Sequence, residues 1–207
     1  MGSARSRDLS QELAPDGKPM VGPFDRAGWR AWLVDNHGAS KGVYLTSWRR
    51  GSGKTSVPYE EAVEEALCVG WVDSTGRNLD EERSLQWFAP RRARSAWARS
   101  NKERVERLMA AGVMLPAGLA AIEEAKRTGM WTLLDDVENL IVPDDLAAAL
   151  AARPPARANW DAFPRSARRA MLEWVVQARR PETRADRIAR IADDARRGQR
   201  AYPPTSD

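Results

Sequence analysis

The sequence predicts an α+β protein that is mostly helical, with a small three-stranded antiparallel sheet in its N-terminal part and a helical unit at its C-terminus. Three observations predict this class. Residues 42–48 alternate between two faces, as a strand does. Two shorter strand candidates, at 71–73 and 84–89, flank a polar turn that contains Gly76. From Pro143 onward, apolar residues recur every three to four positions, which is typical of helices.

The first helix is expected directly after Asp25, a residue type that caps helix N-termini. Trp29, Trp32 and Leu33 then recur at helical spacing, and Gly38 ends the segment. This helix should therefore turn its tryptophans towards the core.

A second helix is expected from about Tyr59 to Val69, because Pro58 suits a first helical turn and Gly70 suits a C-terminal stop. Ser100 and Glu103 form a capping box, which predicts a third helix. The remaining helices are expected at 116–128, 144–152, 164–179 and 183–197.

The domain organisation follows from composition and from the position of prolines. Residues 1–23 are rich in Arg, Ser, Gly and Pro and have no sustained period, which predicts a flexible arm. We expect an α+β domain with the functional site at 24–140, a C-terminal helical module at 141–200 and a tail at 201–207.

The charge balance is mildly basic, with 33 Lys and Arg against 29 Asp and Glu and a pI near 9.6. Much of the positive charge is Arg, which favours bidentate contacts with carboxylate or phosphate. This balance permits an anionic partner but does not demand one.

One cysteine and one histidine exclude an intramolecular disulfide and a zinc site built from Cys and His, and no cofactor or metal is expected. The scarcity of Cys and His does not exclude a cation bound by oxygen ligands. No run approaches the ~18 apolar residues of a membrane span, so we expect a cytoplasmic protein with no membrane partner.

Gly51-Ser52-Gly53-Lys54-Thr55 partly matches a phosphate-binding P-loop. The full motif needs a glycine at position 48, which holds Trp48, so a flexible turn is the better interpretation. Cys68 sits near a C-terminal helix end, which disfavours a thiolate, so we interpret it as a small buried apolar residue.

Asp73 is the candidate catalytic residue, as a general acid or base, because Trp71 on the same strand face would give it a drier setting. The alternative is that Asp73 only ends its strand by accepting hydrogen bonds from the backbone.

A basic cluster follows the second short strand. Guanidinium groups grip anions, and neighbouring indole rings can stack on a ligand, although a solvated basic turn explains the cluster equally well. The expected ligand-binding residues are Trp71, Gln86, Phe88, Arg91, Arg92, Arg94, Ser95, Trp97 and Asn101.

Two blocks of the sequence resemble the bacterial YdeI/OmpD-associated family, also labelled bacteriocin-protection. The first comprises residues 66–73 and 88–92 with Ser95, Trp97 and Asn101. The second comprises residues 163–169, Trp174, residues 182–184 and residues 187–188. The resemblance runs from about Trp29 to Arg200 and implies a role in protection from toxic agents, without a settled reaction or cofactor.

The leading functional hypothesis is a protection or stress-resistance protein. It would bind a small aromatic or anionic toxic molecule in a cleft lined by tryptophan and arginine. In the enzyme version of this hypothesis, the protein also modifies that molecule. One alternative is nucleic-acid binding through the Arg91–Arg94 cluster and its interleaved tryptophans. The other is docking of a partner protein on the C-terminal helices.

Overall fold

The computed structural model describes residues 12–201, which divide into two compact units. Within this range, residues 12–95 and 100–127 form the N-terminal unit, and residues 96–99 and 128–201 form the C-terminal unit. The division falls near residue 128, earlier than the expected boundary after residue 140. Residues 96–99 join the C-terminal unit because the Trp97 N–H donates to the Met130 carbonyl at 3.1 Å and the Trp97 ring packs on Trp131.

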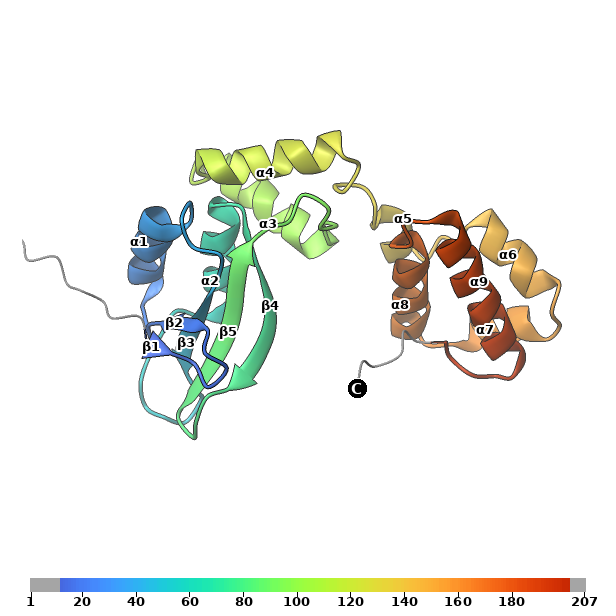
Figure 1. The fold of residues 1–207 in the computed structure, drawn as a ribbon, viewed down its shortest axis with the longest axis horizontal. Helices are drawn as coiled ribbons and strands as arrows, with labels where there is room; N and C mark the ends of the chain where they lie inside the picture. Colours follow the sequence, from blue (N-terminus) through green and yellow to red (C-terminus); the bar gives the residue numbers. More distant parts are fainter. Residues whose placement is uncertain (1–11, 202–207) are drawn as a thin grey trace, which may run out of the picture. The chain divides into compact units, whose positions relative to one another are not determined.

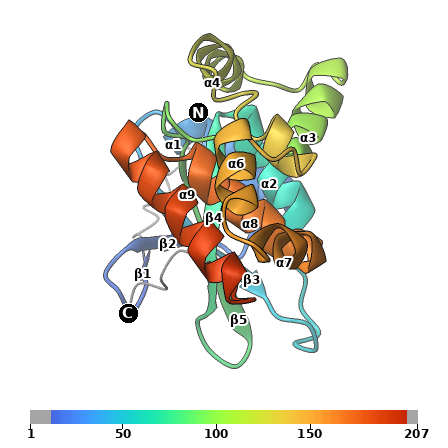
Figure 2. The same ribbon diagram turned by 90° about the vertical axis from the view of Figure 1, so that its right-hand side faces the viewer.

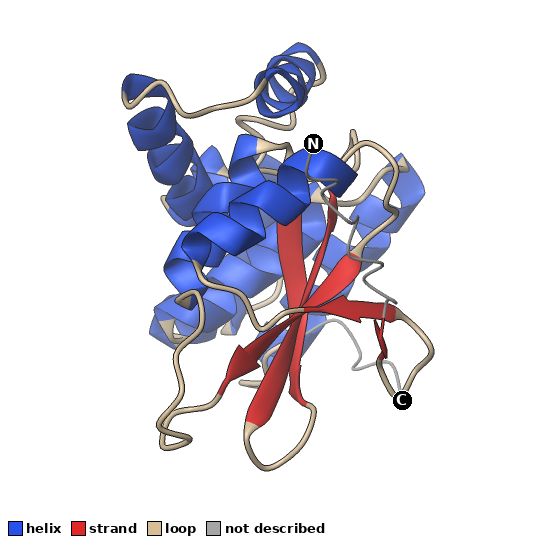
Figure 3. Cartoon of the chain, turned by 90° about the vertical axis from the view of Figure 1, so that its left-hand side faces the viewer, coloured by secondary structure: helices blue, strands red, loops and turns tan. Residues whose placement is uncertain are grey.

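The N-terminal unit contains one sheet, whose strands are red in Figure 3 and run in the order β1-β2-β3-β5-β4 (Figure 1). The strands are β1 (Glu12–Leu13), β2 (Pro19–Val21), β3 (Val43–Trp48), β4 (Trp71–Asn78) and β5 (Arg83–Pro90). β2 and β3 are parallel, and the other neighbouring pairs are antiparallel.

The expected antiparallel strands β3, β5 and β4 are confirmed, but the sheet is mixed and five-stranded. The difference comes from residues 12–21, which we expected in a flexible arm. They pair with the free edge of β3 through β2, at Met20 opposite Tyr44. Residues 1–11 of the expected arm and 202–207 of the expected tail lie outside the described residues.

The helices of the N-terminal unit are α1 (Arg26–Asn36), α2 (Tyr59–Cys68), α3 (Arg99–Ala110) and α4 (Pro116–Arg127). The Asp25 carboxylate accepts the Gly28 N–H at 2.7 Å, so the predicted cap of α1 is confirmed. The buried Trp29 stacks on Trp32 and contacts Phe88, with ring centroids 5.4 and 5.3 Å apart. Its Nε1–H donates to the Ala62 carbonyl of α2 at 3.1 Å. α1 and α2 therefore cover the sheet face that carries Phe88.

Gly70 ends α2 as predicted, with a φ of +76° that L-residues rarely adopt. A Cβ at this position would lie 2.9 Å from the Ala117 carbonyl oxygen of α4. The glycine therefore serves both the turn into β4 and the close approach of α4.

The C-terminal unit is helical, as expected (Figure 2). Its helices are α5 (Asp135–Glu138), α6 (Asp144–Ala151), α7 (Ala156–Ala162), α8 (Arg165–Val176) and α9 (Pro181–Arg196). The predicted anchors of α9, Ile188 and Ile191, are buried, and they share a core with Trp160 of α7. The sequence pattern did not reveal the short helices α5 and α7. Between residues 12 and 201, no helix is long and apolar enough to cross a membrane.

Candidate functional site

A hollow of about 1040 Å³ lies in the N-terminal unit, over one face of the sheet. Its walls are the loop of residues 49–58, between β3 and α2, and the first turn of α2. Its floor is formed by side chains of β3, β4 and β5, the three strands that the sequence predicted.

The strand register explains the floor. Leu45 pairs with Gln86, and Ser47 pairs with Ser84, and side chains directly opposite each other in an antiparallel pair project from the same face. Gly76 also pairs with Gln86, and a Cβ on Gly76 would lie 2.7 Å from the Gln86 amide oxygen. The absence of a side chain at Gly76 therefore leaves room for the Gln86 amide, which donates to the Ser74 carbonyl at 2.9 Å.

The lining of the hollow is basic. Of the described residues that line the hollow, four are cationic and none is an aspartate or a glutamate. The cationic residues are Arg49, Arg50, Lys54 and Arg77.

These four cations differ in how firmly they are held. Arg77 pairs with Asp16 at 2.9 Å, and one Arg49 Nη donates to the carbonyls of Asp80 and Glu81 at 3.2 Å each. Lys54 pairs with Glu82, whereas the exposed Arg50 side chain has no ion pair with any of residues 12–201. Positive charge is therefore available at the rim of the hollow.

The aromatic part of the lining consists of Trp48, Tyr59 and Phe88. Phe88 is fully buried and closes the inner end together with Leu45 and Val57. Trp48 and Tyr59 are more accessible, and Tyr59 is 52 % exposed. The hollow thus offers two accessible rings, and the Lys54 ammonium lies over one of them, that of Trp48.

Tyr59 connects the hollow to the candidate catalytic residue. Its hydroxyl donates to Oδ2 of Asp73 at 2.7 Å. Partial burial, and then this hydrogen bond, raise the pKa of Tyr59 to about 12, so the phenol stays protonated at neutral pH. A β-bulge between Asp73 and Gly76 redirects β4 at this point, as bulges beside functional sites often do.

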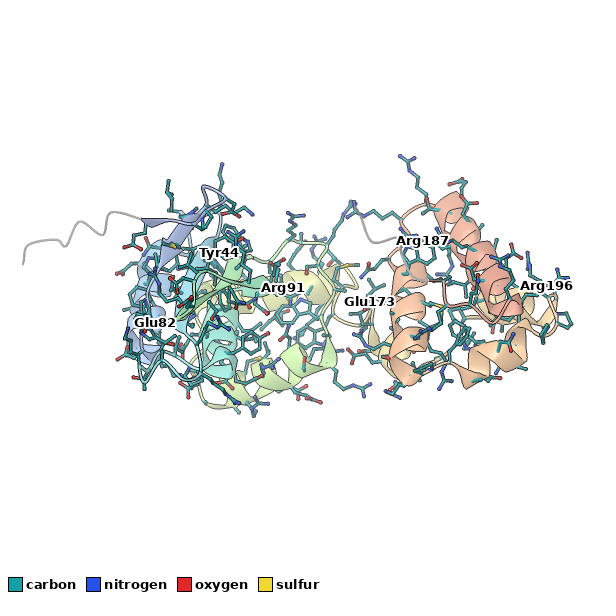
Figure 4. The ribbon with its side chains drawn as sticks, turned by 90° about the horizontal axis from the view of Figure 1, so that it is seen from below. Tyr44, Glu82, Arg91, Glu173, Arg187 and Arg196 are labelled. Carbon is teal, nitrogen blue, oxygen red and sulfur yellow. The ribbon has the colours of Figure 1, made fainter. Side chains whose placement is uncertain are left out.

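The charge of Asp73 acts on the guanidinium of Arg91, which Figure 4 labels. The Arg91 guanidinium donates to the Ser95 hydroxyl at 3.1 Å. Burial lowers the pKa of Arg91 to about 10, although the Asp73 charge opposes this shift, so the group is still charged at neutral pH. The neighbouring Arg92 and Arg94 are exposed.

Several expected ligand-binding residues lie in hydrophobic cores. Trp71 is 1 % exposed, contacts Trp32 edge-on and donates from Nε1 to the His37 carbonyl. Trp97 is also 1 % exposed and belongs to the C-terminal unit. Asn101 accepts a hydrogen bond from Arg104 at 2.9 Å. Of the expected set, Gln86 and Phe88 line the hollow, while Trp71 and Trp97 serve packing.

The sequence interpretation did not assign the loop residues Arg49, Arg50 and Lys54 to a site. The only signal was the glycine-rich Gly51–Thr55 segment, interpreted as a turn, and Gly51 and Gly53 do have positive φ values of 94° and 72°. Cys68 is buried, as expected, and burial raises the pKa of its thiol.

Comparison with known families divides the chain in a similar way. Residues 23–121 match the family described as "Domain of unknown function (DUF8412)", and residues 139–198 match the family described as "Bacteriocin-protection, YdeI or OmpD-Associated". The searches of curated proteins and of solved structures found no significant match. The C-terminal block of the resemblance, at 163–188, falls inside the second match, whereas the N-terminal block falls inside the first. The chain therefore carries a C-terminal domain of the bacteriocin-protection, YdeI or OmpD-associated family, preceded by a domain of a family whose function is unknown.

Proposed function

We propose that the protein binds a small anionic molecule with an aromatic ring in the hollow of its N-terminal unit, as part of a protection or stress-resistance role. The observation that carries this proposal is the charge of the lining. Among the described residues that line the hollow, four are cationic and none is an aspartate or a glutamate. A site with this charge attracts anions and repels cations.

The size and the apolar groups of the hollow support a ligand with a ring. Small-molecule sites typically enclose about 300–1,000 Å³ and combine apolar walls with a few polar groups. Here the inner end is apolar, at Leu45, Val57 and Phe88, and Ser47 and Gln86 add hydrogen-bonding groups to the floor. An anionic group at the basic rim and a ring further inside would match this division.

The protection role is supported by the family of residues 139–198, whose description names bacteriocin protection. Sequestration of a toxic molecule needs only binding. The enzyme version of the proposal adds proton transfer by Asp73, and it is supported by the hydrogen bond that Asp73 accepts from Tyr59, a residue of the lining.

The proposal is tested with 2-naphthoate as the anionic probe and 2-naphthamide as its neutral analogue, by isothermal titration calorimetry. Wild type should bind 2-naphthoate more tightly, and Arg50→Ala/Lys54→Ala should lose about tenfold or more in affinity, because each charged contact is worth roughly 1 kcal/mol or more.

Arg92→Ala/Arg94→Ala is the matched control, because it also removes two exposed positive charges, but at the originally expected cluster. It should leave the affinity within about twofold. Equal losses in both double variants would contradict binding in the hollow. Recovery of unchanged 2-naphthoate after long incubation separates binding from conversion of this probe.

A further inference from the structure

Lys54 contacts both a carboxylate outside the lining of the hollow and an aromatic ring within it. Its Nζ is 2.9 Å from Oε2 of Glu82 and 4.2 Å from the ring centroid of Trp48. Lys54 and Trp48 line the hollow, whereas Glu82, labelled in Figure 4, belongs to the turn between β4 and β5. The Lys54 ammonium group thus contacts a carboxylate of the protein itself and is also within reach of a ligand in the hollow.

The Lys54–Glu82 pair is easily exchanged. The two side chains are 47 % and 56 % exposed, and ion pairs at this exposure contribute little to stability because water screens them. A second anion at the rim can therefore replace the Glu82 carboxylate at little cost.

This exchange does not require the loop to open. The Arg49 N–H donates to the Glu82 carbonyl at 2.8 Å, and the Arg49 guanidinium donates to the carbonyls of Asp80 and Glu81. These bonds join the 49–58 loop to the β4–β5 turn without the Glu82 side chain. Lys54 can also keep its contact with the Trp48 ring, since a cation–π contact uses the ring face and leaves N–H donors free for an anion.

We infer that Lys54 contributes to the selection of anionic over neutral ligands in the hollow, and that Glu82 competes with those ligands for Lys54 and so limits their affinity. The inference rests on the proposed function and refines it to ligands with an oxyanion group, carboxylate or phosphate. An ammonium group is a compact point charge, so it accepts either oxyanion.

The test compares wild type, Glu82→Gln, Lys54→Met and the double variant with three probes: 2-naphthoate, 2-naphthyl phosphate and the neutral 2-naphthamide. Glu82→Gln should raise the affinity for 2-naphthoate by about two- to fivefold, the range expected of one exposed ion pair, and leave the affinity for 2-naphthamide unchanged. Lys54→Met should lower the affinity for 2-naphthoate and cancel the effect of Glu82→Gln in the double variant. A parallel increase with 2-naphthyl phosphate extends the selection to phosphates, and an increase with 2-naphthoate alone restricts it to carboxylates.

Glu81→Gln is the matched control, because Glu81 is the exposed neighbour in the same turn and only its carbonyl contacts Arg49. An equal gain in Glu81→Gln and Glu82→Gln would overturn the inference, since it would reflect net charge alone. If wild type binds 2-naphthoate in preference to 2-naphthamide but Glu82→Gln brings no gain, only the inference fails. If wild type binds neither anionic probe, the proposed function fails with it.

Discussion

The Tyr59 hydroxyl donates a hydrogen bond to Asp73 at 2.7 Å, which joins the first turn of α2 to the edge strand β4 at the wall of the hollow. Both residues come from segments that the sequence predicted, but their contact depends on the packing of α2 against the sheet. The hydrogen bond stabilises the protonated form of the Tyr59 phenol, so the stability of the protein should depend on the protonation of Tyr59.

We predict that stability declines with pH between 10 and about 12 more steeply in wild type than in Tyr59→Phe. The pKa of Tyr59 is raised from 10.0 to about 12, so the unfolded state loses this proton first as pH rises. The stability that the protonated Tyr59 contributes to the folded state is fully present below pH 10 and is lost as pH rises through about 12. Urea unfolding across this pH range measures it, and parallel curves for the two proteins would contradict it. The ultraviolet absorbance of tyrosinate should show a midpoint near 12 that is missing from Tyr59→Phe.

We predict that Glu65→Gln destabilises the N-terminal unit by roughly 2 kcal/mol. Glu65 is 4 % exposed and accepts from Arg26 Nε and Arg30 Nη1 at 2.6 Å each, which ties α1 to α2. Breaking a buried pair costs about 3–5 kcal/mol, and the partial exposure of both arginines reduces this cost. The control is Glu61→Gln, because the partly exposed Glu61 carboxylate is 3.8 Å from Arg26 and its loss should lower the free energy of unfolding by less than ~1 kcal/mol. Equal free energies of unfolding in the two variants would refute this account.

We predict that Gly70→Ala is more destabilising than Gly112→Ala. Both glycines follow helices and have similar φ values, +76° and +68°, so both substitutions carry the same backbone strain of about 1 kcal/mol. Only at Gly70 would the new Cβ meet other atoms, the Ala117 carbonyl oxygen at 2.9 Å, which adds about 1–3 kcal/mol of overpacking. Thermal or urea unfolding compares the two, and an equal loss of stability would mean that α4 moves away freely.

We predict that Trp97→Leu weakens the C-terminal unit and leaves ligand binding intact. Trp97 is buried, and its ring centroid lies 5.0 Å from that of Trp131, so truncation should cost about 3 kcal/mol. Hydrogen exchange should become faster in α5–α9, while the affinity for 2-naphthoate stays within about twofold. Loss of 2-naphthoate binding without faster exchange would instead support the original expectation that Trp97 contacts the ligand.

The helices and central strands were predictable because their signals are local. Asp25 with Trp29 and Trp32 specifies α1, and the alternation at 43–48 specifies β3. β1 and β2 were missed because strands of two and three residues carry too little pattern, and β2 begins at a proline.

The candidate site was only partly predictable. The pattern around Trp71 and Asp73 suits either a lined cleft or a core, and packing decides between them, since Trp32 of α1 covers Trp71. The floor of the hollow depends on pairings such as Ser47 with Ser84, across residues distant in the sequence. The basic loop was interpreted as a turn because its nearest motif, the P-loop, did not fit.

The central claim, that the hollow binds an anionic aromatic molecule, is tested most directly by titrating the ¹⁵N-labelled protein with 2-naphthoate and following backbone amide shifts. The account predicts saturable shifts in residues 49–58 and at Gly76 and Gln86, with no comparable change at 91–95. Shifts confined to 91–95 and Asn101, or no shifts in the 49–58 loop at saturating 2-naphthoate, would contradict it.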